Sequence, residues 1–299
     1  MVILIPKMLD LTILLNQGRE QVPVTKMVDP FDVKMGSIPN IVPLLRDEGR
    51  TFASGSVVLA ERLAALRSGN QQQIEAWGNN FYDLADACLT FEDVLKVQPD
   101  SPLLKGIRGI VETAEGLYVA VSAAAVSAAA KHEMRYFPVR ASETVNYSVG
   151  DSKVKRTVTD VVLLKYAQPA YVELSGDQFN AVDAQPLKRG DFVYQRDMEA
   201  KEIVKDGDVV HPVYKALLPA ELVVPLVTET FAFNKRTYSY DANMGLYLAG
   251  EPQEHAELRA FCAYGLNDWS RLNGDSSFGG NDIRLVGVVE GSAAGAAKK

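Results

Sequence analysis

The residues that could do chemistry are dispersed along this chain. The three histidines lie far apart, at His132, His211 and His255. No Cys-x-x-Cys or His-Glu-x-x-His spacing is present, so the usual arrangements of zinc ligands are missing. The sequence therefore predicts neither a metal site nor a cofactor.

The densest group of ligand-type residues is Glu251, Glu254, His255 and Glu257. On a helix that begins near Glu251, the side chains of Glu251 and His255 would share one face and could hold a cation. Acidic residues at a helix N-terminus also offset the helix dipole with no metal involved. Both interpretations fit the pattern, and the second needs no ligand.

Signatures of common enzymes are also missing from the sequence. There is no Gly-x-Ser-x-Gly elbow, Ser-x-x-Lys pair, Walker loop or Gly-x-Gly-x-x-Gly fingerprint. Asp241, Glu251 and Asp282 could contribute to a dispersed carboxylate site, but acidic residues are plentiful throughout this chain. We expect that the protein is not an enzyme, with a carboxylate enzyme as a less favoured alternative.

Basic residues suggest a possible contact with nucleic acid. If they joined into one strip, Tyr147, Tyr166 and Tyr238 could stack on bases. Alternating Lys and Thr beside apolar residues is also typical of the solvated face of a sheet. The candidate residues are Lys153, Lys155, Arg156, Lys188, Arg189, Lys235 and Arg236.

A glycine-rich loop runs from Asn273 to Gly280, and its backbone N–H groups could approach a phosphate closely. With its flanking segments, from Glu251 to Val289, it resembles the C-terminal helix, loop and strand of the RAMP-type backbone subunits of CRISPR effector complexes. Phe278 precedes Gly279-Gly280 here, which departs from the Gly-Phe-Gly order of that family. The resemblance implies a nucleic-acid-binding subunit of a ribonucleoprotein complex.

Composition favours a soluble globular protein. The 299 residues are 47% hydrophobic and 23% charged, and the net charge is −7. That charge argues against a surface built throughout for nucleic acid or anionic lipid. Cys88 and Cys262 have apolar neighbours, which predicts buried free thiols and a reducing compartment. The uncharged stretch 116–130 is too short to span a membrane, so we expect a cytoplasmic protein, or a virion protein if viral, with no membrane partner.

The first half of the chain predicts helices. Residues 1–50 contain five prolines and are typical of an extended N-terminal arm. Residues 51–135 are expected to form a helical region, because apolar residues recur at helical spacing over 54–68 and 74–95. A third helix is expected over 101–132, with Pro102 in its first turn and many alanines after it.

The second half predicts strands. Residues 136–290 are expected to be β-rich, with hairpins at 145–159 and 203–210 and apolar strands at 161–164, 222–227 and 283–289. A helix is expected at about 252–272, because Glu251-Pro252 suits a first turn. Residues 291–299, which are mostly Ala, Gly and Lys, predict a flexible tail.

Together these features predict an α+β fold with a helical N-terminal half, a mostly antiparallel β region in the middle, and a C-terminal helix and strand. The arm, the tail and the missing catalytic motifs favour a non-enzymatic structural subunit of a large homo-oligomeric assembly, for example the capsid or tail of a phage or virus. Its partners would be copies of itself and other assembly subunits. The alternative is the nucleic-acid-binding subunit described above.

Overall fold

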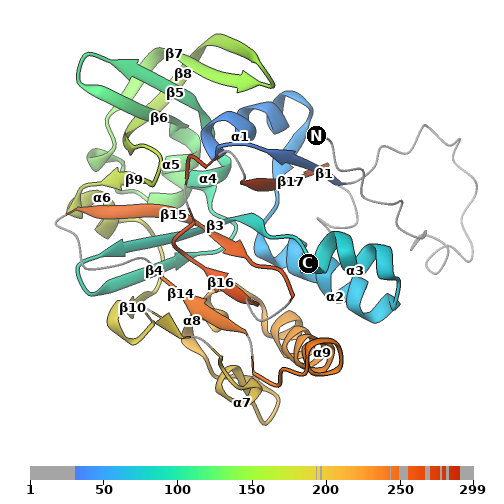
Figure 1. Cartoon of the computed structure of the whole chain (residues 1–299). Helices are drawn as coiled ribbons and strands as arrows, with labels where there is room; N and C mark the ends of the chain where they lie inside the picture. The colour runs from blue at the N-terminus through green and yellow to red at the C-terminus, as the bar shows by residue number, and fades with distance from the viewer. Residues whose placement is uncertain are drawn as a thin grey trace, which may run out of the picture.

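The computed structural model describes residues 31–192, 194–195, 197–242, 244–248, 255–266, 270–276, 278–280 and 283–289. They fold around one large mixed sheet of 15 strands, with helices on both of its faces (Figure 1). The prediction of a helical N-terminal half is wrong, because six strands lie between Phe31 and Ser122.

The α-helices are short, apart from α2 and α9. They are α1 (Ile38–Asp47), α2 (Gly55–Ser68), α3 (Gln71–Gly78), α4 (Pro102–Lys105), α5 (Ala123–Ala130), α6 (Gly176–Ala181), α7 (Ala200–Ile203), α8 (Pro212–Leu217) and α9 (Ala220–Tyr238). Two 3₁₀ turns, η2 (Met134–Tyr136) and η3 (Arg189–Phe192), accompany them.

The strands run through the whole described chain. They are β1 (Phe31–Met35), β2 (Arg50–Phe52), β3 (Tyr82–Phe91), β4 (Val94–Gln98), β5 (Ile107–Thr113), β6 (Gly116–Ser122), β7 (Val139–Val149), β8 (Ser152–Ala167), β9 (Tyr171–Leu174), β10 (Pro186–Lys188), β11 (Tyr194–Gln195), β12 (Val204–Lys205), β13 (Asp208–Val209), β14 (Gly245–Tyr247), β15 (Ala256–Ala263), β16 (Arg271–Asn273) and β17 (Arg284–Val289). β12 and β13 form a separate hairpin.

Strand β3 lies at the centre of the sheet, in the order β1-β17-β3-β15-β9-β8-β6-β5-β7. Its side chains alternate between two apolar cores. Leu84 and Cys88 enter a core that also contains residues of α2, α8 and α9. Ala85 and Leu89 enter a second core with residues of α1, α4, α5 and α6. β3 is buried on both faces, and its sequence is mostly apolar apart from the buried Asp83, Asp86 and Thr90.

At one end of the sheet, β5, β6, β8 and β7 close into a ring. β6 pairs with both β5 and β8, β7 pairs with β8, and Ile110 of β5 lies opposite Asn146 of β7. The ring encloses a small core of its own, formed by Val111, Ala120, Val145 and Val161. Gly109 sits at a bulge in the pairing of β5 with β6, with a φ of +139°, and a Cβ there would lie 2.9 Å from the carbonyl of Asn146 in β7.

Several local predictions are confirmed. A helix occupies 55–68, and the β7–β8 and β12–β13 hairpins turn at the predicted places. Val161 and Val162 pair on both sides, with β6 and with β7, as expected for a buried strand. Residues 284–289 form a strand, and Cys88 and Cys262 are buried free thiols.

Other predictions of helices and strands are wrong, mostly because the sequence of a strand buried on both faces of the sheet also fits the spacing of a helix. The segment 74–95 is the end of α3 followed by β3 and the start of β4, and 101–132 contains α4, β5, β6 and α5. The described residues of the predicted helix at 252–272 contain strand β15 and the start of β16, and the predicted strand at 222–227 lies within α9. Apolar runs fit helical spacing by chance when both faces are buried.

The predicted N-terminal arm is only partly described. Residues 31–50 contain β1 and α1, with Pro39 in the first turn of α1 and Pro43 inside it. Residues 1–30 and the predicted tail at 291–299 lie outside the described residues. Within the described part of the chain, no helix combines the length and the apolar character needed to cross a membrane.

Candidate functional site

The basic residues predicted to bind nucleic acid lie on three separate elements. Lys153, Lys155 and Arg156 are on the outer half of β8, Lys188 and Arg189 are at the junction of β10 and η3, and Lys235 and Arg236 are near the end of α9. Figure 1 shows these elements in different parts of the molecule. Arg189 is buried, and Arg156 forms an ion pair with Asp47 of α1. The structure does not join these residues into one strip.

The acidic residues and the histidine that the sequence suggested as a cation site do not come together among the described residues. Glu251, Glu254 and Asp282 lie outside the described residues. His255 stacks on Tyr171, whose hydroxyl lies 2.7 Å from its Nε2. Glu257 is buried and accepts a hydrogen bond of 3.1 Å from Arg259. No group of three or more His, Cys, Asp and Glu in the described ranges could hold a metal ion.

The described part of the glycine-rich loop packs against the core. A Cβ on Gly274 would lie 2.7 Å from both Cys88 Sγ and Leu248 Cδ2, and a Cβ on Gly279 would meet Pro169 at 3.1 Å. Neither glycine is among the residues with a positive φ. These glycines therefore permit close packing, and the helix that the family resemblance implied before them is strand β15.

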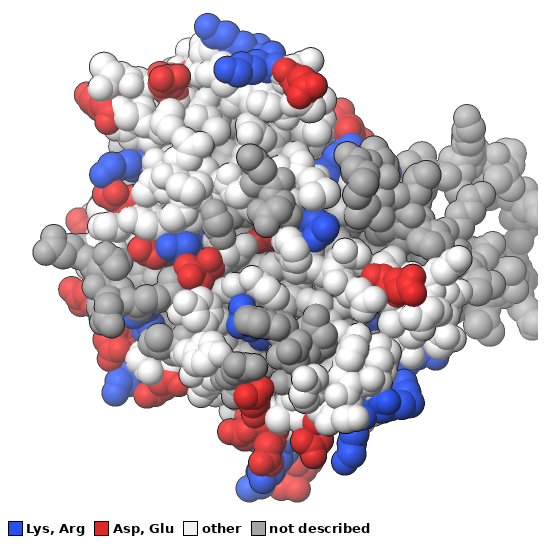
Figure 2. All heavy atoms as spheres, in the orientation of Figure 1, with Lys and Arg blue, Asp and Glu red and all other residues white. Residues whose placement is uncertain are grey.

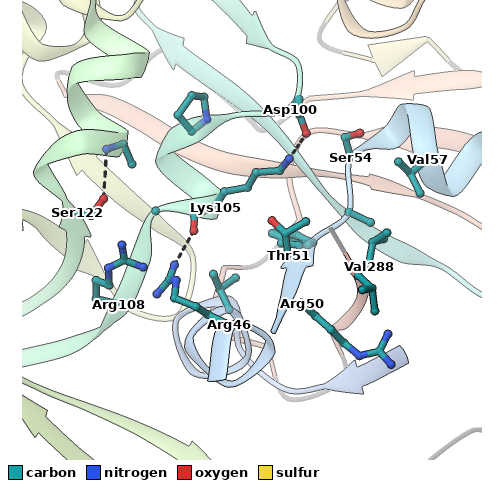
Figure 3. A pocket seen from close by; sticks show the side chains of 17 residues that line it. Arg46, Arg50, Thr51, Ser54, Val57, Asp100, Lys105, Arg108, Ser122 and Val288 are labelled. Atoms are coloured by element: carbon teal, nitrogen blue, oxygen red, sulfur yellow. Dashed lines mark hydrogen bonds and ion pairs between the residues drawn. The ribbon is translucent and has the colours of Figure 1, made fainter. Parts of the chain in front are cut away.

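A cavity of about 510 Å³ opens between α1, α2, α4 and α5 (Figure 3). Its walls come from segments that are distant in the sequence. β2 and the start of α2 form one side, β17 closes it with Val288 and Val289, and Arg108 enters from β5. A volume of this size is in the range of small-molecule sites.

Four cationic side chains line this basic cavity. Arg46 donates a 2.8 Å hydrogen bond from Nη2 to the carbonyl of Lys105. Lys105 Nζ forms an ion pair with Asp100, and Arg50 Nη1 lies 3.4 Å from the carbonyl of Gly287. Four cations and one carboxylate give the lining a formal charge of +3, in a chain whose net charge is −7.

Arg108 is the least satisfied of these cations. Its Nη1 is buried and has no hydrogen-bond partner among the described residues. Burial lowers the pKa of its guanidinium, because the charged form loses solvation. Figure 3 draws the guanidinium groups of Arg108 and Arg46 at the same end of the cavity. An anion placed there would lie beside both guanidinium groups, and a small shift of the Arg108 side chain would be needed for Nη1 itself to donate to it.

Hydroxyl and apolar side chains complete the lining. Ser54 is the N-cap residue of α2, and its side chain makes no capping hydrogen bond. Ser122 Oγ accepts a 3.2 Å hydrogen bond from the backbone of Ala125. Val57 and Val288 form part of an apolar wall across the cavity from Arg108 (Figure 3). The cavity thus offers one end with Arg46 and Arg108 and another end with apolar side chains, where Arg50 lies beside Val288 (Figure 3).

A fully buried carboxylate fixes two walls of the cavity. Asp86 of β3 accepts hydrogen bonds from the backbone N–H groups of Gly55 and Asp100, the second at 2.8 Å. These contacts hold the start of α2 and the turn before α4, and so position Ser54 and Asp100. Burial raises the pKa of Asp86 to about 6, although both hydrogen bonds favour its charged form.

Comparisons with known proteins give no family for this chain. No protein-family model matches it, and neither does any curated protein. A solved structure from work on the accommodation of massive sequence variation in Nanoarchaeota by the C-type lectin fold aligns with 86% of this chain and 96% of its own. The identity is 11% and the TM-score 0.38, so this similarity carries no argument about fold or function.

Proposed function

We propose that this protein is a non-enzymatic binding protein that holds an anionic group in the basic cavity. The observation that carries the proposal is the half-buried guanidinium of Arg108, whose Nη1 has no hydrogen-bond partner among the described residues, in a lining of formal charge +3. Partial burial takes away some of the solvation of the Arg108 guanidinium, and an anion beside it would offset that loss. Binding would therefore also stabilise the folded protein.

The cavity offers little for catalysis. Among its lining residues, all of them described, there is no histidine or cysteine, and Asp100 is the sole acid. Asp100 is already paired with Lys105, so it is poorly placed to act as a general base. The hydroxyls of Thr51, Ser54 and Ser122 have no neighbouring base to activate them. These features support binding rather than reaction.

Isothermal titration calorimetry with inorganic phosphate, at constant ionic strength, tests this function. We expect saturable binding with a 1:1 stoichiometry. Arg108→Gln and Arg46→Gln should each weaken binding by about tenfold or more, because each removes a charge-assisted hydrogen bond. Arg236→Gln is the matched control, since Arg236 is exposed near the end of α9, away from the cavity. Equal affinities for all four proteins, or no binding, would contradict the proposal.

A structural role in a homo-oligomeric assembly, such as a virion, is the second candidate function. The β7–β8 hairpin favours it, because most residues of its two strands are exposed, including Val139 at 48% and Val149 at 37%. Figure 2 shows basic side chains gathered over the outer end of this hairpin. Exposed ribbons with apolar residues are common contact elements between protein copies. The partners would be copies of this chain or other assembly subunits.

Light scattering after size-exclusion chromatography, at low and high salt, tests the second candidate. A salt-resistant oligomer that Val139→Asp dissociates would support it, and a monomer at every salt concentration would contradict it. The ratio of absorbance at 260 and 280 nm reports on the nucleic-acid-binding alternative. A nucleic-acid-like ratio that falls at high salt would favour that alternative.

A further inference from the structure

The size of the basic cavity indicates a ligand larger than a free inorganic anion. Phosphate has five heavy atoms and takes the space of about three waters, or roughly 90 Å³. The cavity measures about 510 Å³. An inorganic anion beside Arg108 would leave most of that volume to water, so the remaining space is large enough for an organic group attached to the anion.

The lining divides this space into two chemically different parts. Arg46 and Arg108 lie at one end, and Val57 and Val288 lie at the other, with Arg50 beside Val288 (Figure 3). Val57 is partly buried and packs against the core that contains Val288. Moving an apolar group out of water and against these two valines would be favourable. The ligand should therefore be charged at one end and apolar at the other.

The positive charge of the cavity lining indicates which anionic group the ligand carries. The Lys105–Asp100 ion pair cancels within itself, which leaves three arginines, of which Arg46 and Arg108 lie at the cationic end and Arg50 lies beside Val288. A phosphate monoester carries a charge of about −1.5 to −2 at neutral pH, whereas a carboxylate carries a single charge. The planar guanidinium group also matches phosphate oxygens with two parallel hydrogen bonds. A phosphate monoester fits both the charge and the donors.

We infer that the ligand is a small organic phosphate monoester whose phosphate lies at Arg46 and Arg108 and whose apolar body lies against Val57 and Val288. This inference rests on the proposed function, because it assigns a chemical class to the anion of the same cavity. Thr51 lies between the two ends, and its hydroxyl is placed to accept from or donate to a polar atom near the ester linkage.

Calorimetric titration with phenyl phosphate, inorganic phosphate and benzoate tests the inference. Phenyl phosphate should bind about tenfold or more tighter than inorganic phosphate, because its ring leaves water for the apolar wall. Benzoate has the ring but one charge, and it should bind more weakly than phenyl phosphate. Val57→Ser should remove most of the preference for phenyl phosphate and change the affinity for inorganic phosphate by less than about twofold. Val57→Ala is a milder second variant, in case serine at this position unfolds α2.

The outcomes separate this inference from the proposed function. If inorganic phosphate binds in an Arg108-dependent way but phenyl phosphate binds no tighter, the ligand class is wrong and the proposed function stands. If neither compound binds, both fail. If a 5′-phosphorylated oligonucleotide binds tighter than phenyl phosphate, the small-molecule class is overturned. If Val57→Ser leaves the preference unchanged, the placement of the apolar body is wrong.

Discussion

Arg62 should be among the residues on which the stability of this fold depends most. It lies on α2 with 4% of its surface exposed. Its guanidinium donates to three backbone carbonyls, those of Trp77 at 2.9 Å, Tyr264 at 2.7 Å and Asn80 at 3.1 Å. It therefore ties α2 to the end of α3, to the turn before β3 and to the segment after β15. We predict that Arg62→Met destabilises the protein strongly.

The magnitude follows from two opposing contributions. Three hydrogen bonds to a charged donor contribute about 1.5 to 3 kcal/mol each, or about 4.5 to 9 kcal/mol together. Burial lowers the pKa of Arg62 to about 10, which corresponds to roughly 3 kcal/mol against its charged form. Methionine keeps most of the apolar stem and removes both contributions. The net loss should be about 2 to 6 kcal/mol of the free energy of unfolding.

Urea unfolding followed by circular dichroism measures this loss, as a lower midpoint with an unchanged slope. Arg67→Met is the matched control on the same helix. The Arg67 side chain is 54% exposed and meets Glu229 at 3.3 Å, so its replacement should change stability by less than about 1 kcal/mol. If Arg62→Met costs no more than Arg67→Met, the three carbonyl contacts do not hold these segments together and the reasoning fails.

Three further predictions concern other buried groups. Burial lowers the pKa of His211 to about 4, so as the pH drops from about 6.5 to 4 the histidine is protonated in the unfolded chain before it is protonated in the folded protein, and stability falls. His211→Gln should remove roughly 3 kcal/mol of this fall, measured by urea unfolding at a series of pH values. An unchanged loss of stability below pH 6.5 would contradict this prediction. Gly274→Ala should cost about 1 to 3 kcal/mol, because its Cβ would lie 2.7 Å from Cys88 Sγ; an unchanged unfolding midpoint would show that the loop shifts freely. Burial raises the pKa of the Cys88 thiol to about 12 and also raises the pKa of the Cys262 thiol. A thiol reagent should therefore label both residues only after denaturation. Rapid labelling of the native protein would refute their burial.

Local turn chemistry made some of the fold predictable from the sequence. Gly150 takes a φ of +58° between β7 and β8, and Gly207 a φ of +88° between β12 and β13. Glycine adopts these conformations without strain, so the two hairpins are encoded within a few residues. The start and end of α2 were predictable for a similar reason, because Gly69 ends the helix in the left-handed conformation.

The central strands could not be predicted in this way. In β15, every residue from Ala256 to Ala263 is buried, and Leu258, Phe261 and Cys262 fit a helical spacing as well as a strand. The difference is decided by long-range pairing with β3 and β9. In α9, Pro225 and its β-branched neighbours disfavour a helix locally, but packing against α2 and the sheet core outweighs that preference.

The basic cavity was missed for a different reason. Arg46, Lys105 and Arg108 form no basic cluster in the sequence, because α1 is separated from α4 and β5 by more than fifty residues. The clusters that the sequence does show, at 153–156 and 235–236, are exposed on separate elements. A local signal for the cavity exists only in part, as an arginine and a lysine around the Gly106 turn. Bringing that turn to α1 requires the completed sheet.

The position of β3 between β15 and β17 has a consequence for biosynthesis. The ring of β5, β6, β7 and β8 is built from one continuous stretch and can form soon after residue 167 leaves the ribosome. β3 emerges much earlier, but its neighbours β15 and β17 are made last, with residues up to Val289. β3 can pair with β4 early, but it waits for β15 and β17 through most of translation, and strand edges left unpaired for that time favour aggregation of the nascent chain.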